Sequence, residues 1–158
     1  MGNFGAIKKG EIRVMSAGTG IQHSEFNGSK EKPVTLLQIW VIPRENGVEP
    51  RYDQLKISDN ALDNEFQQIV SPNPDDAGVW IHQDAWFHLA DFDKGFSKTY
   101  ELKKVGNGMY VFVISGIITV NGQELATRDG FGIWNIDAID IKANSNVELL
   151  LMEVPMQF

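Results

Sequence analysis

The chain has 158 residues, no cysteine, a formal net charge of −7 and 42% hydrophobic residues, which fits a globular protein and excludes disulfide bonds, thiolate catalysis and cysteine-based zinc sites. The sequence has no basic stripe of the kind that a phosphate backbone requires, so we expect no direct binding of nucleic acid. No apolar run is long enough to span a membrane and no secretory signal is evident, so we expect a soluble, cytoplasmic protein.

The N-terminal third is predicted to hold three strands. Residues 12–15 alternate apolar and polar side chains after a turn, which is typical of a half-buried strand. Residues 34–42 form a nearly continuous apolar run between two prolines, rich in side chains that favour sheets, so we predict a buried strand. Residues 51–54 predict a weaker strand. Residues 59–65 are the one stretch that fits a short helical turn.

Short strands at regular intervals occupy the rest of the chain. A loop rich in proline, asparagine and aspartate at residues 71–78 follows a predicted strand at 66–70 and precedes an alternating stretch at 79–89. Further strands are predicted at 110–114, 117–120, 123–125, 131–134, 137–141 and 147–154. The first three of these read as a β-meander with an Asn-Gly hairpin turn. Such a pattern predicts an all-β barrel or sandwich.

The stretch Met15–Glu25 carries the most chemistry. Gly18 and Gly20 allow a tight turn, and a His-Ser-Glu triplet follows it. If the triplet is extended, His23 and Glu25 point to the same face, where an imidazole and a carboxylate suit a divalent metal. The alternative is a turn followed by a strand with a solvated polar face. Spacing alone favours that alternative, because two ligands do not make a site.

A second acidic and imidazole pair occurs further along the chain. In the alternating stretch, His82 and Asp84 share a predicted face with Trp86 and His88. The geometry is the same as that predicted for the first pair. A polar sheet face is the favoured interpretation here, with a metal site as the alternative.

Several stretches carry a resemblance to a known family. Residues of the second cupin motif occur in the usual order, with Ser16 where many cupins have proline: Gly10, Gly18, His23 and Asn27. The strings VMSAGTGIQHSEFN, LLQIWVIPRENGVEPRYDQ and SPNPDDAGVWIHQDAWFH extend the match over nearly the whole chain. Together they resemble the pirin family of two-domain cupins. The resemblance implies an all-β cupin (jelly-roll) fold, with a remnant of the N-terminal cupin domain at residues 1–56 and a complete C-terminal barrel at residues 57–158.

The resemblance also implies site residues. Pirins hold a metal with two histidines of an HPHRG-like motif and with the histidine and glutamate of an HSE motif, so His23 and Glu25 would be ligands and Glu25 also the catalytic base. The HPHRG-like pair has no counterpart here, so the chain resembles a pirin lacking the front half of its first cupin domain. The implied divalent metal is iron first, with copper, nickel and manganese as alternatives, and we expect it to be weakly held or absent. In the second barrel Tyr100, Leu102 and Met109 replace metal ligands, which predicts a structural role or an apolar binding module.

Three functions follow from the resemblance. Some pirins are similar to flavonol (quercetin) dioxygenases, which implies a flavonol-like substrate for the intact protein and weak or absent activity for this chain. The alternative is a non-enzymatic, metal-dependent regulator that binds a protein partner. The third is a fragment without activity of its own. Because an exposed apolar strand at residues 34–42 must find cover, we also expect a homodimer or larger assembly, with residues 1–56 against a partner or against the C-terminal barrel.

Overall fold

The computed structural model describes residues 5–57 and 63–157, and every regular element in those ranges is a β-strand. A two-stranded sheet pairs β1 (Glu11–Ser16) with β2 (Arg51–Lys56). A six-stranded sheet has the order β10 (Gly130–Ile133), β7 (Asn107–Ser115), β12 (Val147–Pro155), β5 (Trp86–Phe92), β3 (Gln67–Ser71) and β4 (Val79–Trp80). A four-stranded sheet has the order β6 (Ser97–Glu101), β11 (Ala138–Ala143), β8 (Ile117–Val120) and β9 (Gln123–Ala126).

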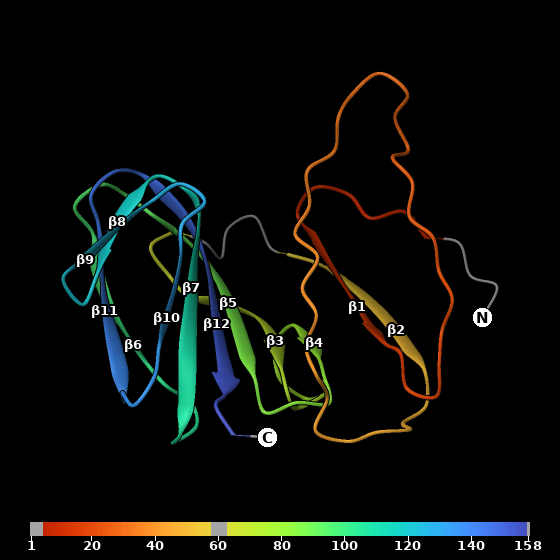
Figure 1. Cartoon of the computed structure of the whole chain (residues 1–158). Coiled ribbons are helices and arrows are strands. Elements are labelled where there is room, and N and C mark those ends of the chain that lie inside the picture. The colour runs from red at the N-terminus through yellow and green to blue at the C-terminus, as the bar shows by residue number, and fades with distance from the viewer. Residues whose placement is uncertain (1–4, 58–62, 158) are drawn as a thin grey trace.

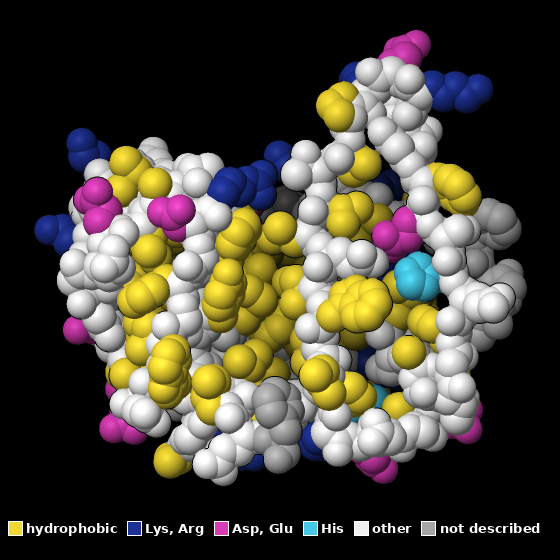
Figure 2. All heavy atoms as spheres, in the orientation of Figure 1, with side chains coloured by type: hydrophobic (Ala, Val, Ile, Leu, Met, Phe, Trp, Pro, Cys, Tyr) yellow, Lys and Arg dark blue, Asp and Glu magenta, His cyan; other side chains and the backbone are white. Residues whose placement is uncertain are grey.

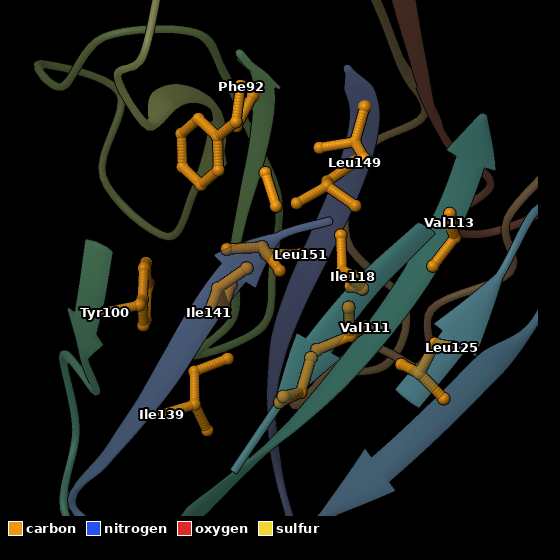
Figure 3. Close-up of a cluster of buried hydrophobic side chains, with 14 of the residues drawn as sticks. Phe92, Tyr100, Val111, Val113, Ile118, Leu125, Ile139, Ile141, Leu149 and Leu151 are labelled. Carbon is orange, nitrogen blue, oxygen red and sulfur yellow. The ribbon is translucent and has the colours of Figure 1, made fainter. Parts of the chain in front are cut away.

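The two larger sheets close into a barrel, and the β1–β2 sheet lies beside it (Figure 1). Side chains from both sheets meet inside the barrel, where Phe92, Ile118, Ile139 and Leu151 are among the buried residues (Figure 3). This arrangement is the jelly-roll cupin fold expected from the sequence. None of the described residues belongs to a helix long and apolar enough to cross a membrane.

Strand β12 explains why the N-terminal part packs where it does. Leu149 and Leu151 point into the barrel, while Leu150 between them belongs to a second buried cluster on the outer face of the sheet. Ile12 and Val14 of β1 pack against that second cluster. Two apolar faces on one sheet therefore give both the barrel core and a seat for the β1–β2 sheet.

Most predicted strands are confirmed, and the hairpin turn is confirmed in detail. Asn121 and Gly122 have φ values of 47° and 87°, the positive values that a two-residue type I′ turn requires. The predicted meander is wrong, because β7 pairs with β10 and β12 while β8 pairs with β9 and β11. Gly116, with φ of 95°, turns the chain from one sheet to the other, and a Cβ there would overlap the carbonyl of Asn146.

The alternating stretch at residues 79–89 is two strands rather than one. Strand β4 ends at Trp80 and pairs in parallel with β3, whereas β5 begins at Trp86 and pairs with β3 antiparallel. The single shared face predicted for the whole stretch is therefore wrong. Of the helical turn predicted at 59–65, residues 59–62 lie outside the described residues. Asp63 forms an isolated bridge with Asp91 and Asn64 is a turn residue, so that part is not helical.

The buried strand predicted at residues 34–42 is also wrong. These residues belong to no strand in the described chain, and Trp40 is 90% exposed. Part of the chain between β1 and β2 projects away from the barrel as an orange loop (Figure 1). The apolar run has the composition of a strand, but the described chain supplies no neighbouring strand to complete its hydrogen-bond ladder.

Candidate metal site

The segment that carries His23 is positioned by a turn after β1. The amide of Gly20 donates to the carbonyl of Ala17 at 2.8 Å, and the amide of Thr19 donates to the carbonyl of Val48 at 3.1 Å. Gly18 has φ of 53°, and a Cβ at this position would overlap the Val48 carbonyl. Glycine is therefore required for the turn to dock on the loop before β2.

An ion pair fixes the position of Glu25. Its carboxylate pairs with the guanidinium of Arg13, with exposed fractions of 30% for the Glu25 side chain and 19% for that of Arg13. Arg13 lies in the middle of β1, opposite Gln54 of β2. The sequence analysis missed this residue. Its signal was its place between Ile12 and Val14, since a strand that buries those two sends Arg13 to the other face.

His23 is exposed, and neither His23 nor Glu25 lies in a strand. Strand alternation therefore does not position the pair, and the shared face inferred from it stays a prediction. Within the described residues no group of three or more histidine, cysteine, aspartate or glutamate side chains could hold a metal ion. Two ligands, one of them neutralised by Arg13, fall short of the three or four protein ligands typical of a transition-metal site.

The second pair, His82 and Asp84, has a structural role. Asp84 forms ion pairs with Arg44 and Lys104, and the carbonyl of His82 accepts a hydrogen bond from the amide of Arg44 at 2.7 Å. The hydrogen bond from Lys104 lowers the pKa of Asp84, against an opposing effect of desolvation, and Arg44 lowers it further. The ring of His82 lies edge-on to that of Trp80. These contacts tie the segment after residue 42 to the barrel.

A buried polar cluster lies inside the C-terminal barrel. Glu153 of β12 is fully buried, and its carboxylate accepts hydrogen bonds from the Tyr100 hydroxyl at 3.0 Å and from the Asn107 side chain at 2.9 Å. Burial, followed by the charge of Glu153, raises the pKa of Tyr100. Met109 packs in the same core, so both residues that replace metal ligands here serve the interior of the barrel. Leu102 packs at its edge.

His88 is the other ionisable group of this interior. Its ring is 3% exposed and lies edge-on to Tyr100, with centroids 5.0 Å apart. Its Nδ1 atom has no hydrogen-bond partner among the described residues. Burial, with a smaller effect of the Lys103 charge, lowers the pKa of His88 from 6.5 to about 4. The imidazole is therefore neutral at physiological pH.

Comparison with known proteins places this architecture in a family. The family described as the quercetinase C-terminal cupin domain matches residues 68–154, and the family described as pirin matches residues 1–41. The chain belongs to the pirin family. This pirin is 37% identical over 155 residues to quercetin 2,3-dioxygenase of Escherichia coli K12 and 34% identical to a putative quercetin 2,3-dioxygenase of Pseudomonas aeruginosa. The alignments cover 98% of this pirin in both cases, but only 65% and 66% of the relatives.

Solved structures show the same likeness. The crystal structure of YhhW from E. coli matches this pirin with a TM-score of 0.92 at 36% identity, covering 98% of this chain and 64% of YhhW. A second structure, of YhhW in complex with nickel(II), matches with a TM-score of 0.85 and covers 92% and 62% of the two chains. The chain therefore spans about two thirds of the relatives that it matches. The cupin fold is common to all three structures.

Arg13 and a metal ion compete for the same carboxylate, which gives a first testable prediction. Replacing Arg13 by glutamine frees Glu25, so the affinity for nickel(II) should rise roughly two- to fivefold, the equivalent of one exposed ion pair. Titration of the purified protein with nickel(II) against a chelating dye measures it. Arg128→Gln, which removes a positive charge outside the ion pair, is the control and should leave the affinity unchanged. Equal affinities for the wild type and Arg13→Gln would contradict the competition.

Proposed function

We propose that this pirin carries part of the metal site of a quercetin-type dioxygenase and that, by itself, it binds metal weakly and degrades flavonols slowly or not at all. The observation that carries the proposal is the state of Glu25. The carboxylate proposed as ligand and base is engaged by Arg13, and His23 is the only other proposed ligand in its segment. The likeness to quercetin 2,3-dioxygenases supports the choice of reaction.

The chemistry proposed for Glu25 requires that its ion pair opens. A general base must reach the proton that it removes within hydrogen-bond distance, and a carboxylate held by a guanidinium is a weaker base. His23, being exposed, is accessible to a ligand without rearrangement. The two residues therefore contribute unequally, with His23 free to engage a metal and Glu25 held back by β1.

Metal analysis and a flavonol assay test the proposal together. We expect less than one iron, copper, nickel or manganese ion per chain after purification, and loss of quercetin in air no faster than in buffer containing the same free metal. Weak nickel(II) binding should fall further in His23→Ala, because this variant removes one of only two proposed ligands. His82→Ala is the matched control, since His82 packs against Trp80 and should not affect metal binding. One tightly bound metal per chain with quercetin turnover would contradict the proposal.

A non-enzymatic, protein-binding role is the second candidate. It is favoured by the exposed apolar side chains of residues 34–42, which lie on an extended segment outside the barrel. Single exposed apolar residues are ordinary, but a contiguous run of them is typical of an interaction surface. Retention of a cellular partner by His23→Ala would favour this role over a metal-dependent one.

A further inference from the structure

A run of exposed apolar side chains lies along the segment between β1 and β2. We call it the apolar strip, and its members are Val34, Leu36, Leu37, Ile39, Trp40 and Ile42. No comparable run of large exposed apolar residues occurs elsewhere in the described chain, where they are scattered. In Figure 2 hydrophobic side chains of this part of the molecule border a hollow beside the barrel. The strip is therefore a surface feature and not a set of isolated residues.

Exposure along the apolar strip alternates with a period of two residues. Val34, Leu36, Trp40 and Ile42 are 59%, 54%, 90% and 68% exposed, whereas Leu37 and Ile39 are 43% and 42% exposed. Val41, in phase with the less exposed set, packs against the outer cluster of the barrel. This is the pattern of a strand that buries one face and presents the other. The presented face is the more apolar one, which is the reverse of an ordinary surface strand.

The backbone of the apolar strip is available for pairing. Within the described part of the chain, residues 34–41 make no backbone hydrogen bond. Just beyond them the segment is anchored, since the carbonyl of Ile42 accepts a hydrogen bond from the Gln83 side chain at 2.8 Å and the amide of Arg44 donates to His82. The segment is thus held in place as an extended chain with open donors and acceptors, which is what an added strand requires.

The comparisons indicate what fits there. The fold of this pirin matches that of YhhW with a TM-score of 0.92 over 98% of its length, although YhhW has a further third of chain that this pirin does not match. The extended segment is part of that match, so its shape is shared with a protein that contains additional polypeptide. We propose that the apolar strip docks a strand-forming polypeptide with alternating apolar side chains, of the kind supplied by the unmatched third of the E. coli relative.

The occupant pairs with the backbone of residues 34–41 and covers the outward side chains, of which Trp40 is the most exposed. Hydrogen bonds along the strand give affinity and alternate side chains give register. Buried tryptophan side chains often dominate such interfaces, so Trp40 should contribute most. The docking requires no metal and goes beyond the proposed function, which it leaves independent.

Co-expression of this pirin with a tagged copy of the unmatched part of the E. coli relative tests the proposal, with a chelator present throughout. We expect a one-to-one complex by light scattering, and slower hydrogen exchange at the amides of residues 34–42. Trp40→Asp should weaken the complex at least tenfold, since it places a charge in the apolar contact. Val105→Asp is the matched control, because Val105 is 93% exposed but lies outside the strip, and it should change the affinity less than twofold.

Three outcomes would overturn the proposal. The first is the absence of a complex at tens of micromolar protein. The second is a complex with unchanged affinity in Trp40→Asp, provided that its urea midpoint equals that of the wild type. The third is self-association of this pirin that Trp40→Asp abolishes, which would assign the apolar strip to a second copy of the chain. Because no readout involves metal or flavonol, failure here is distinct from failure of the proposed function.

Discussion

Glu153→Gln is expected to lower the free energy of unfolding by about 3 kcal/mol, because it leaves buried donors facing a donor. One carboxylate oxygen accepts from the Lys104 amide and the Asn107 side chain, both at 2.9 Å. The other accepts from the Lys103 amide at 2.8 Å and the Tyr100 hydroxyl at 3.0 Å. A glutamine has only one acceptor oxygen, so its NH₂ group must oppose two of these donors. Urea unfolding followed by tryptophan fluorescence measures the change.

The control for this prediction lies on the same strand. Glu148 of β12 is exposed, so Glu148→Gln should change the free energy of unfolding by less than about 0.5 kcal/mol. If Glu153→Gln were as mild as Glu148→Gln, the four hydrogen bonds would not be holding residues 103–107 against the barrel. A stable Glu153→Gln variant with altered hydrogen exchange only in that loop would also limit the effect to the loop.

His88 is expected to make the fold sensitive to acid. Its folded-state pKa is lowered to about 4 from an unfolded value of 6.5, so the unfolded chain binds a proton that the folded chain does not between these pH values. Stability is then fully present above about pH 6.5 and is lost as the pH falls towards 4. The difference of about 2.5 pKa values corresponds to about 3 kcal/mol of unfolding free energy. Urea unfolding between pH 7 and pH 4.5 measures the slope.

A non-titrating variant separates His88 from the other groups. His88→Met fills the same interior position next to Tyr100 without a proton to bind, so the part of the slope due to His88 should disappear. Asp91 acts in the opposite direction, because burial and then the charges of Glu148 and Asp63 raise its pKa. The difference between the wild type and His88→Met is therefore the quantity to compare. Parallel pH profiles for the two proteins would refute the assignment.

Local sequence patterns were sufficient wherever one segment determines its own conformation. The hairpin at Asn121 and Gly122 follows from residues that tolerate positive φ, and strands such as β11 and β12 follow from apolar alternation or continuous apolar runs. The absence of cysteine excluded a set of chemistries directly. The His-Ser-Glu motif indicated the family, and the family indicated the cupin fold.

Partners distant in sequence could not be derived in this way. The run at residues 34–42 has strand composition, but a strand also needs a neighbour, and the described chain provides none. The meander failed for a related reason, because β7 and β8 are consecutive in sequence yet pair with strands of different sheets. The single face predicted at residues 79–89 failed because the chain breaks between β4 and β5.

The sequence by itself determined that this is an all-β member of the pirin family with an imidazole and a carboxylate two residues apart. Only the tertiary structure decided that Arg13 holds Glu25, that Glu153 and His88 share the interior of a closed barrel, and that residues 34–42 remain unpaired. The reason is physical. Backbone preference and apolar period act between neighbours in sequence, whereas ion pairs, burial and strand pairing depend on which distant segments the fold brings together.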